Sequence, residues 1–415
     1  MSQLQPSRIL IANEITRSYC GSQPWAKDAV VYHKSIDWKD FDIFINQSEY
    51  DPYICEVINE ARANLVPSLH IADGIIEWRN NWEHPPRSYD RIGAPIWQPV
   101  LSDKIACIGA AQLRTLATWS NSRKVELVGI PRLTASIEHY LSNAYEEQSQ
   151  QAVLITTAKQ PYFQQGDFIA VIQALQDIKT YLEAKQITAK WRLPDELSNH
   201  LNLTPIERQS GQGTLAQVLA SVGAVITTPS TLILEAMLYR KPVLRLDYTN
   251  APQYVRTAWN ITAQEHISKE IDSALIHDKR RLSFQDEALH DACYIEAANS
   301  RLTLLVQRMV DQRIIAQKTG KLQLDESLMP VPESFGFASF TLRVLHQNHG
   351  DYAMEGEDRL RAENAQLRNL LIQERTAFEA HIRYFEQPPA SFLRRVLRLF
   401  ANQKPTNSLV HWRRH

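Results

Sequence analysis

The chain has 415 residues, enough for two to three domains of ordinary size, so a single small module is excluded. Lys and Arg number 45 against 46 Asp and Glu, and this formal net charge of -1 excludes a generally basic, nucleic-acid-binding domain. With 44% hydrophobic and 22% charged residues the composition is that of a globular protein, and no apolar run reaches the length of a membrane span.

The N-terminus and the cysteines indicate a reducing, intracellular setting. The first residues show no basic region followed by an apolar stretch, so we expect no secretory signal and a cytoplasmic location. The four cysteines are far apart and form no CxxC pair, so we expect neither a disulfide framework nor a structural zinc site.

Residues 1–132 alternate short apolar runs with helix-like stretches. The runs are SRILIAN, DAVVYHK, FDIFIN, VPSLHIADG, DKIACIG and KVELVGIPRL. Val/Ile/Leu-rich runs of this length between helices are typical of buried parallel strands, so an N-terminal α/β domain is predicted. The polar residues 133–151 that follow predict a linker between domains.

The same alternation restarts after the linker. It predicts strands at 153–157, 187–193, 224–227 and 242–247, and helices at 166–184, 214–222 and 230–239. The sequence is then mostly helical as far as residue 318. We therefore expect a second doubly wound α/β domain over residues 152–318, closed by helices.

The C-terminal segment predicts extra helices. Residues 319–352 have turn and loop signals of a second linker, and residues 353–387 predict a short coiled-coil helix. Apolar and register-setting residues at spacings of three and four over 358–385 suggest a homodimer contact, and a lone helix packed on the body is the alternative. Among these residues are Leu360, Asn364, Leu367 and Leu371.

The tail, residues 388–415, combines basic and apolar residues. Six Lys and Arg residues and no acidic residue follow residue 387, and Phe392, Leu393, Val396 and Leu397 supply an apolar side. This composition suits an anionic membrane surface, which would make the protein peripheral to the inner membrane. A frayed basic tail is the alternative.

The segment GAVITTPSTLILEAMLYRKPVLRLD at 223–247 is the most informative. A strand ends at Thr227, Pro229 follows, and Ser230 and Thr231 open a helix whose free N–H groups suit a phosphate. Glu235 lies one turn on, where its carboxylate can accept hydrogen bonds from a ribose diol. Ordinary helix capping is the other interpretation.

This segment resembles the nucleotide-binding element of GT-B glycosyltransferases, in which a (S/T)-P-S-(S/T) turn and an E-A pair precede a G-K-P-V strand. Here the three parts read TTPST, LEA and RKPVL, with Arg240 in place of glycine. HIADG, DKIACIG and VGIPR follow the order found in the capsule and CDP-glycerol polymer group of bacterial surface-polysaccharide enzymes. The resemblance implies two Rossmann-like doubly wound domains facing a cleft.

The resemblance also implies catalytic residues in the first domain. Sialyltransferase- and Kdo-transferase-like enzymes place an acidic pair before a glycine where this chain has Asp73 and Gly74, so Asp73 is the candidate general base. Glu77 and His70 would complete the acceptor pocket, beside Trp78 and Arg79. An Asp-Gly turn without catalytic role is the alternative. The His-Pro motif of those enzymes is missing, which disfavours a CMP-sugar donor.

Strand ends of the second domain supply the remaining donor-binding candidates, because ligands bind outside the carboxyl ends of strands in open α/β sheets. Lys159 and Arg192 would offset diphosphate charge, or else are solvated loop charges. A GxGxxG/A match at 211–216 lacks a preceding strand and is interpreted as a loop with Thr214 as helix N-cap. The full candidate set is Thr156, Lys159, Arg192, Thr214, Thr228, Ser230, Thr231 and Glu235.

We therefore expect a glycosyltransferase that uses a nucleotide-sugar donor and a glycan or lipid-linked acceptor. Asp73 would deprotonate the acceptor, and the turn at Ser230 and Thr231 would stabilise the leaving phosphate. No DxD pair or metal-ligand spacing is found, so we expect neither a metal nor a cofactor. The alternatives are an isomerase resembling UDP-GlcNAc 2-epimerase and a non-catalytic scaffold with a GT-B-like body.

Overall fold

The computed structural model describes most of the first 330 residues, namely 8–83, 96–142, 152–249 and 251–330. The predicted coiled coil at 353–387 and the basic tail at 388–415 lie outside the described residues, and so do the dimer and membrane expectations that depend on them. Among the described residues, no helix is long and apolar enough to cross a membrane.

The first half of the described chain forms a parallel sheet. Its strand order is β2-β1-β3-β4-β5-β6. These strands are β1 (Ile9–Ile11), β2 (Val30–Val31), β3 (Ile43–Asn46), β4 (Ser68–Ile71), β5 (Lys104–Cys107) and β6 (Val125–Leu127).

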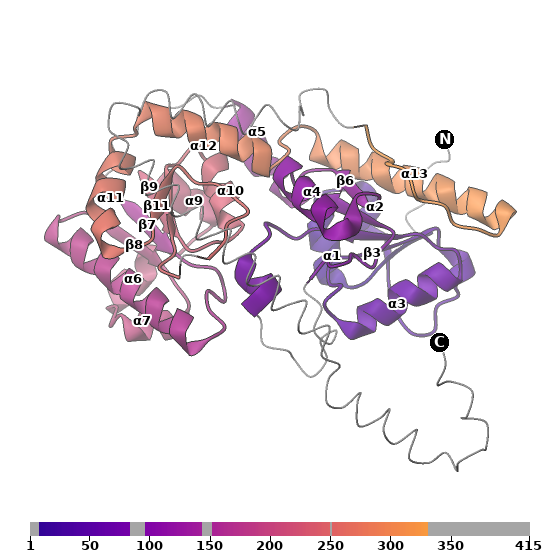
Figure 1. Cartoon of the computed structure of the whole chain (residues 1–415), viewed down its shortest axis with the longest axis horizontal. Coiled ribbons are helices and arrows are strands. Elements are labelled where there is room, and N and C mark those ends of the chain that lie inside the picture. The colour runs from indigo at the N-terminus through magenta and orange to yellow at the C-terminus, as the bar shows by residue number, and fades with distance from the viewer. Residues whose placement is uncertain (1–7, 84–95, 143–151, 250, 331–415) are drawn as a thin grey trace, which may run out of the picture. The chain divides into compact units, whose positions relative to one another are not determined.

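Helices and single turns connect these strands (Figure 1). They are α1 (Glu14–Tyr19), α2 (Pro24–Lys27), η2 (Trp38–Asp40), α3 (Pro52–Ala63), η3 (Arg79–Glu83), α4 (Ala110–Leu116), η4 (Ala117–Asn121), η5 (Pro131–Leu133) and α5 (Thr134–Ser142). Side chains alternate across the strands, so Leu10 and Phe44 pack toward α3, whereas Ile9 and Ile43 pack toward the opposite face. Both faces are apolar because both are covered.

The second half forms another parallel sheet, with strand order β11-β10-β9-β7-β8. These strands are β7 (Val153–Thr156), β8 (Ala189–Arg192), β9 (Ala224–Thr227), β10 (Val243–Leu246) and β11 (Trp259–Ile261). The order reverses between β7 and β9, where Thr156 pairs with Thr227. In doubly wound sheets this switch point is where ligands bind.

Helices also cover both faces of the second sheet. They are α6 (Gln165–Ala184), α7 (Asp195–His200), α8 (Pro205–Ser210), α9 (Leu215–Ala220), α10 (Leu232–Leu238), η6 (Gln264–His266), α11 (Ile267–Leu275) and α12 (Lys279–Ala292). Val153 and Ile155 pack with α6, and Leu154 and Val225 pack with α10 on the other face. The fold is therefore the predicted pair of Rossmann-like doubly wound α/β domains.

The last described helix, α13 (Ala298–Thr319), packs on the first sheet rather than the second (Figure 1). Its residues Leu302, Leu305 and Met309 are buried with Ile11 and Ile43. This differs from the expectation that residues 152–318 all build the second domain. The physical reason is that the first sheet has an apolar face, which this returning helix covers together with Trp25 and Ala26 of α2.

Candidate functional site

The two segments singled out in the sequence meet in space. An ideal Cβ on Gly74 would lie 1.9 Å from Oγ1 of Thr231, so glycine permits the loop after β4 to touch the turn before α10. The N–H of Ile75 donates to the same Oγ1 at 3.2 Å. On the other side, Nε2 of Gln112 donates to the carbonyl of Gly74 at 2.9 Å. These contacts hold Asp73 beside the turn at 228–231.

Arg132 joins the same two segments, and its importance was missed in the sequence. Its Nη2 donates to the carbonyl of Asp73 at 3.3 Å, and its Nη1 lies 3.4 Å from Oε1 of Glu235. Glu235 therefore has an arginine partner in this structure, and its contact with a ribose stays a prediction. The signal was present, because Arg132 ends the VGIPR motif.

The two predicted carboxyl groups of the first domain have altered acidity. Asp73 as a residue is exposed to solvent, but burial of its carboxyl group raises the pKa of that group. The charges of His70 and Arg132 act in the opposite direction and lower it. Burial raises the pKa of Glu77 to about 7, opposed by Arg79 and reinforced by Asp73. A carboxyl group with a pKa near neutral can both accept and donate a proton, which suits acid–base chemistry.

A small, partly open cavity lies between the first domain and the end of β10. From the first domain it is lined by residues 75–79, which include Glu77, and from the second by Pro229, Ile233, Arg245 and residues 251–255. Glu77 is the predicted site residue that lines it. The main chain at Glu77 also forms a bridge with Gln253, so the two domains close this cavity between them.

Two arginines in this cavity were not among the predicted donor residues. Arg79 is 3% exposed and Arg245 is 1% exposed. The sequence predicts Arg79 beside the acceptor pocket and gives no role to Arg245. Its signal was a charged residue inside the apolar strand run PVLRLD, where burial of an arginine is unusual.

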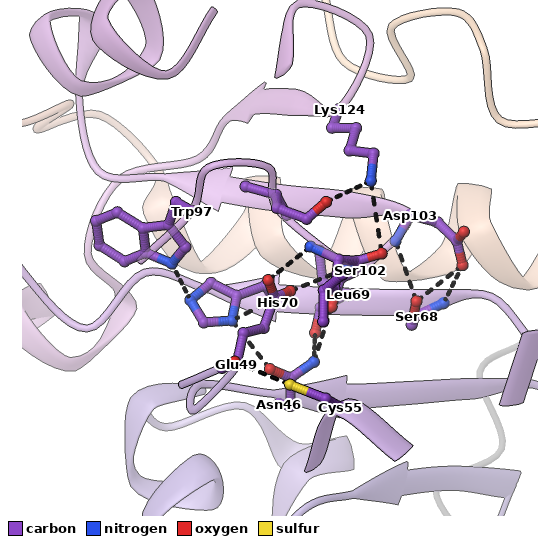
Figure 2. Close-up of polar contacts among 12 residues, drawn as sticks. Asn46, Glu49, Cys55, Ser68, Leu69, His70, Trp97, Ser102, Asp103 and Lys124 are labelled. Atoms are coloured by element: carbon purple, nitrogen blue, oxygen red, sulfur yellow. Dashed lines mark hydrogen bonds and ion pairs between the residues drawn. The ribbon is translucent and has the colours of Figure 1, made fainter. Parts of the chain in front are cut away.

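His70 lies in the interior of the first domain, within a hydrogen-bond network (Figure 2). Its Nε2 accepts from Nε1 of Trp97 at 2.9 Å, and its Nδ1 lies 2.9 Å from Oδ1 of Asn46. Burial lowers the pKa of His70, opposed by Glu49 and Asp73. A neutral ring with both nitrogens engaged has no free position for an acceptor hydroxyl. The structure therefore gives His70 the surroundings of a positioning residue.

Three predicted donor-binding residues gather at the switch point of the second sheet. Thr156 and Thr228 are buried at the ends of β7 and β9, and the N–H of Ala158 donates to Oγ1 of Thr228 at 2.8 Å. Oγ of Ser230 lies 3.5 Å from Oγ1 of Thr227. The loops after β7 and β9 are thus tied together beside the start of α10.

The remaining donor candidates lie near the edge strand β8, in the case of Arg192 and Thr214, and after β7, in the case of Lys159. Arg192 donates through Nη1 to the carbonyls of Gly211 and Gly213 at 3.1 and 3.0 Å. Thr214 is the N-cap of α9 and forms a capping box with Gln217. Lys159 is exposed. Arg192 and Thr214 therefore order a loop at β8, and neither these two side chains nor Lys159 lines the cavity of Glu77 and Arg245.

No group of three or more His, Cys, Asp and Glu side chains among the described residues is arranged to hold a metal ion. The polar chemistry of the site therefore consists of the carboxyl groups of Asp73 and Glu77, the guanidinium groups of Arg79, Arg132 and Arg245, and the hydroxyls of the switch point.

This architecture, two Rossmann-like domains with a site between them, is of the GT-B type. No family model and no curated protein matches the sequence. Among solved structures, the chain is similar to the wall teichoic acid polymerase TagF, at 10% identity and a TM-score of 0.43, covering 75% of this chain and 90% of that one.

Two further structures have a similar fold. The Staphylococcus aureus MnaA–UDP structure is 13% identical, with 66% of this chain and 75% of that chain covered and a TM-score of 0.41. UDP-N-acetylglucosamine 2-epimerase from Rickettsia bellii is 10% identical, with 75% and 98% covered and a TM-score of 0.44.

Proposed function

We propose that this chain transfers a glycosyl unit from a nucleotide-sugar donor to a hydroxyl group of a glycan or lipid-linked acceptor. The observation that carries the proposal is the contact between the loop of Asp73 to Glu77 and the turn at 228–231. Acid–base groups from one domain thereby face the switch point of the other, which is the arrangement a two-substrate reaction needs.

In this proposal Asp73 takes the proton from the acceptor hydroxyl as its oxygen attacks the anomeric carbon of the donor. The bond from that carbon to the phosphate oxygen breaks, and the nucleoside diphosphate leaves with the electron pair. Thr228, Ser230 and Thr231 would stabilise the leaving phosphate by hydrogen bonding. The raised pKa of Asp73 makes it a stronger base than an ordinary aspartate.

One observation favours a second candidate, a sugar-nucleotide isomerase. Glu77 has a pKa of about 7 and lines the cavity near a second carboxyl group, Asp73. Such a pair could remove a proton from a sugar carbon and return one to it, which requires no acceptor. The scaffold alternative assigns no chemistry to either group.

The test begins with a thermal-shift panel of UDP, GDP, CDP, CMP and TDP on the full chain, using wild type and Glu235→Ala. A ligand at 100 times its Kd stabilises a protein by about 2.7 kcal/mol. The matching sugar nucleotide is then incubated with and without candidate acceptors. Transfer product that requires acceptor and is lost in Asp73→Asn supports the transferase; altered sugar nucleotide without acceptor supports the isomerase. Nucleotide indifference together with no product contradicts both.

A further inference from the structure

We propose that Arg79 and Arg245 form a binding pocket for an oxyanion of the substrate, in the cavity between the loop after β4 and the end of β10. The assignment of the oxyanion to a substrate rests on the proposed function. The pocket itself rests on the two side chains and the cavity that they share.

Both guanidinium groups are buried without their full set of partners. Among the described residues, Nη2 of Arg79 and Nε and Nη1 of Arg245 are buried and have no hydrogen-bond partner. Buried polar atoms in folded proteins are nearly always hydrogen-bonded, so three unpaired donors in one place need an explanation. A bound anion would supply the missing acceptors.

The surroundings increase the cost of leaving these donors unpaired. The same cavity is lined by Ile75, Ile76, Ile233 and Val255. A charge in apolar surroundings is unfavourable unless it is paired and hydrogen-bonded. Burial lowers the pKa of Arg245 only to about 10, so its guanidinium is still charged at neutral pH.

The acidic groups nearby do not take these hydrogens. Asp247 follows Arg245 by two residues and favours its charge, but Oδ1 of Asp247 accepts from Thr249, and its Oδ2 also lacks a partner. Glu77 lines the cavity and accepts from Asn80 at 3.2 Å. Because its pKa is about 7, Glu77 is about half protonated at neutral pH, which reduces its repulsion of an incoming anion.

The chemistry and size of the cavity define the ligand class. The planar, forked guanidinium matches carboxylate and phosphate oxygens, so both are suitable. The cavity is small and partly open, so it suits the charged group of a ligand rather than a whole sugar nucleotide. The oxyanion therefore has two possible sources, the phosphates of the donor or an acidic group on a sugar of either substrate.

The two arginines come from different domains. Arg79 follows β4 and already reaches the second domain, since its Nη1 donates to the carbonyl of Pro161 at 2.5 Å. Arg245 belongs to β10. An anion held by both would add a link between the domains, so its binding should raise the Tm of the whole unit.

The experiment measures calorimetric binding of inorganic pyrophosphate, UDP and glucuronate to the full chain. The variants are Arg79→Gln and Arg245→Gln, and the matched control is Arg313→Gln, which changes another buried arginine with an unpaired Nε outside the cavity. We expect at least one probe to bind wild type, the control to match it, and both variants to bind roughly tenfold or more weakly.

The outcome identifies the source of the anion. Weaker binding of pyrophosphate and UDP assigns the pocket to the donor, and weaker binding of glucuronate alone assigns it to an acidic sugar. Saturable binding of no probe, or equal affinities in all four proteins, overturns the proposal. If Arg245→Gln does not fold, Arg245→Met provides the same test, because methionine fills the space without an unpaired charge.

This experiment separates the pocket from the proposed function. Probe binding needs no turnover, so anion binding that depends on both arginines without any transfer product contradicts only the transferase. Transfer product formed with an unchanged KM in both arginine variants contradicts only the pocket.

Discussion

Arg132 lies 3.4 Å from Oε1 of Glu235 and also donates to the main chain of Asp73. One guanidinium thus joins the end of the first domain, its predicted base and the helix of the second domain. We expect Arg132→Met to lower the rate of transfer strongly and the free energy of unfolding only slightly. The substitution frees the loop of Asp73 without opening the core. Since both side chains are partly exposed, a double-mutant cycle with Glu235→Gln should give a coupling of roughly 0.5–1 kcal/mol in urea unfolding. Zero coupling would contradict the contact.

Gly74 has no space for a side chain. We expect Gly74→Ala to destabilise the protein by about 1–3 kcal/mol, because its Cβ would collide with Thr231. Thr231→Ala should cost about 1 kcal/mol through loss of the acceptor for Ile75. The double variant should be more stable than the sum of the two single effects, as measured by urea unfolding. Gly166, beside which a Cβ meets nothing, is the control position. Strict additivity would argue against the contact.

The raised pKa of Glu77 predicts that the stability of the folded chain falls as the pH rises. Its pKa is about 7 in the folded chain against an ordinary value of 4.5, so the folded state binds more protons between these pH values. The contribution of Glu77 to the free energy of unfolding is therefore full below pH 4.5 and is lost as the pH rises to about 7. Glu77→Gln should remove this loss and raise stability at pH 8 by about 1–3 kcal/mol. Parallel wild-type and variant profiles of stability against pH would contradict the assignment.

The lowered pKa of His70 predicts the opposite dependence, a loss of stability as the pH falls. Its lowered pKa means that the folded state disfavours the protonated ring, so the contribution to stability is present above the ordinary pKa of 6.5 and is lost as the pH falls below it. We expect His70→Phe to cost about 1–3 kcal/mol by leaving Asn46 and Trp97 without their partner. If His70 only positions the loop, the pH profile of kcat should keep its shape in this variant. Loss of one limb of the pH profile of kcat would instead indicate that His70 is a catalytic residue.

The buried ion pair of Lys104 and Glu126 holds the end of the described chain on the first domain. Both side chains are fully buried at 2.8 Å, and Glu126 also accepts from the N–H groups of Leu328 and Met329. We expect Glu126→Gln to cost about 3–5 kcal/mol, because it leaves a buried ammonium uncompensated. The surface pair of Glu14 and Arg17 is the control, and Glu14→Gln should cost much less stability than Glu126→Gln. Thermal unfolding and limited proteolysis near residue 328 would measure both.

The sequence by itself determined the two parallel sheets, because uninterrupted apolar runs between helices can only be buried as strands covered on both faces. It also located the loop at Asp73 and the turn at Ser230, because glycine, proline and small polar residues mark the ends of strands. Arg245 lies within PVLRLD and Arg132 within VGIPR, and the sequence predicts no site role for either arginine.

Only the tertiary structure decided which of these segments meet. Gly74 and Thr231 are 157 positions apart in the chain, and no local pattern encodes a contact over that distance. The same is true of His70, whose strand position suggested the site and whose ring is engaged by Trp97 and Asn46. The return of α13 to the first sheet and the shared cavity of Arg79 and Arg245 depend on packing between domains, which side-chain periodicity does not record.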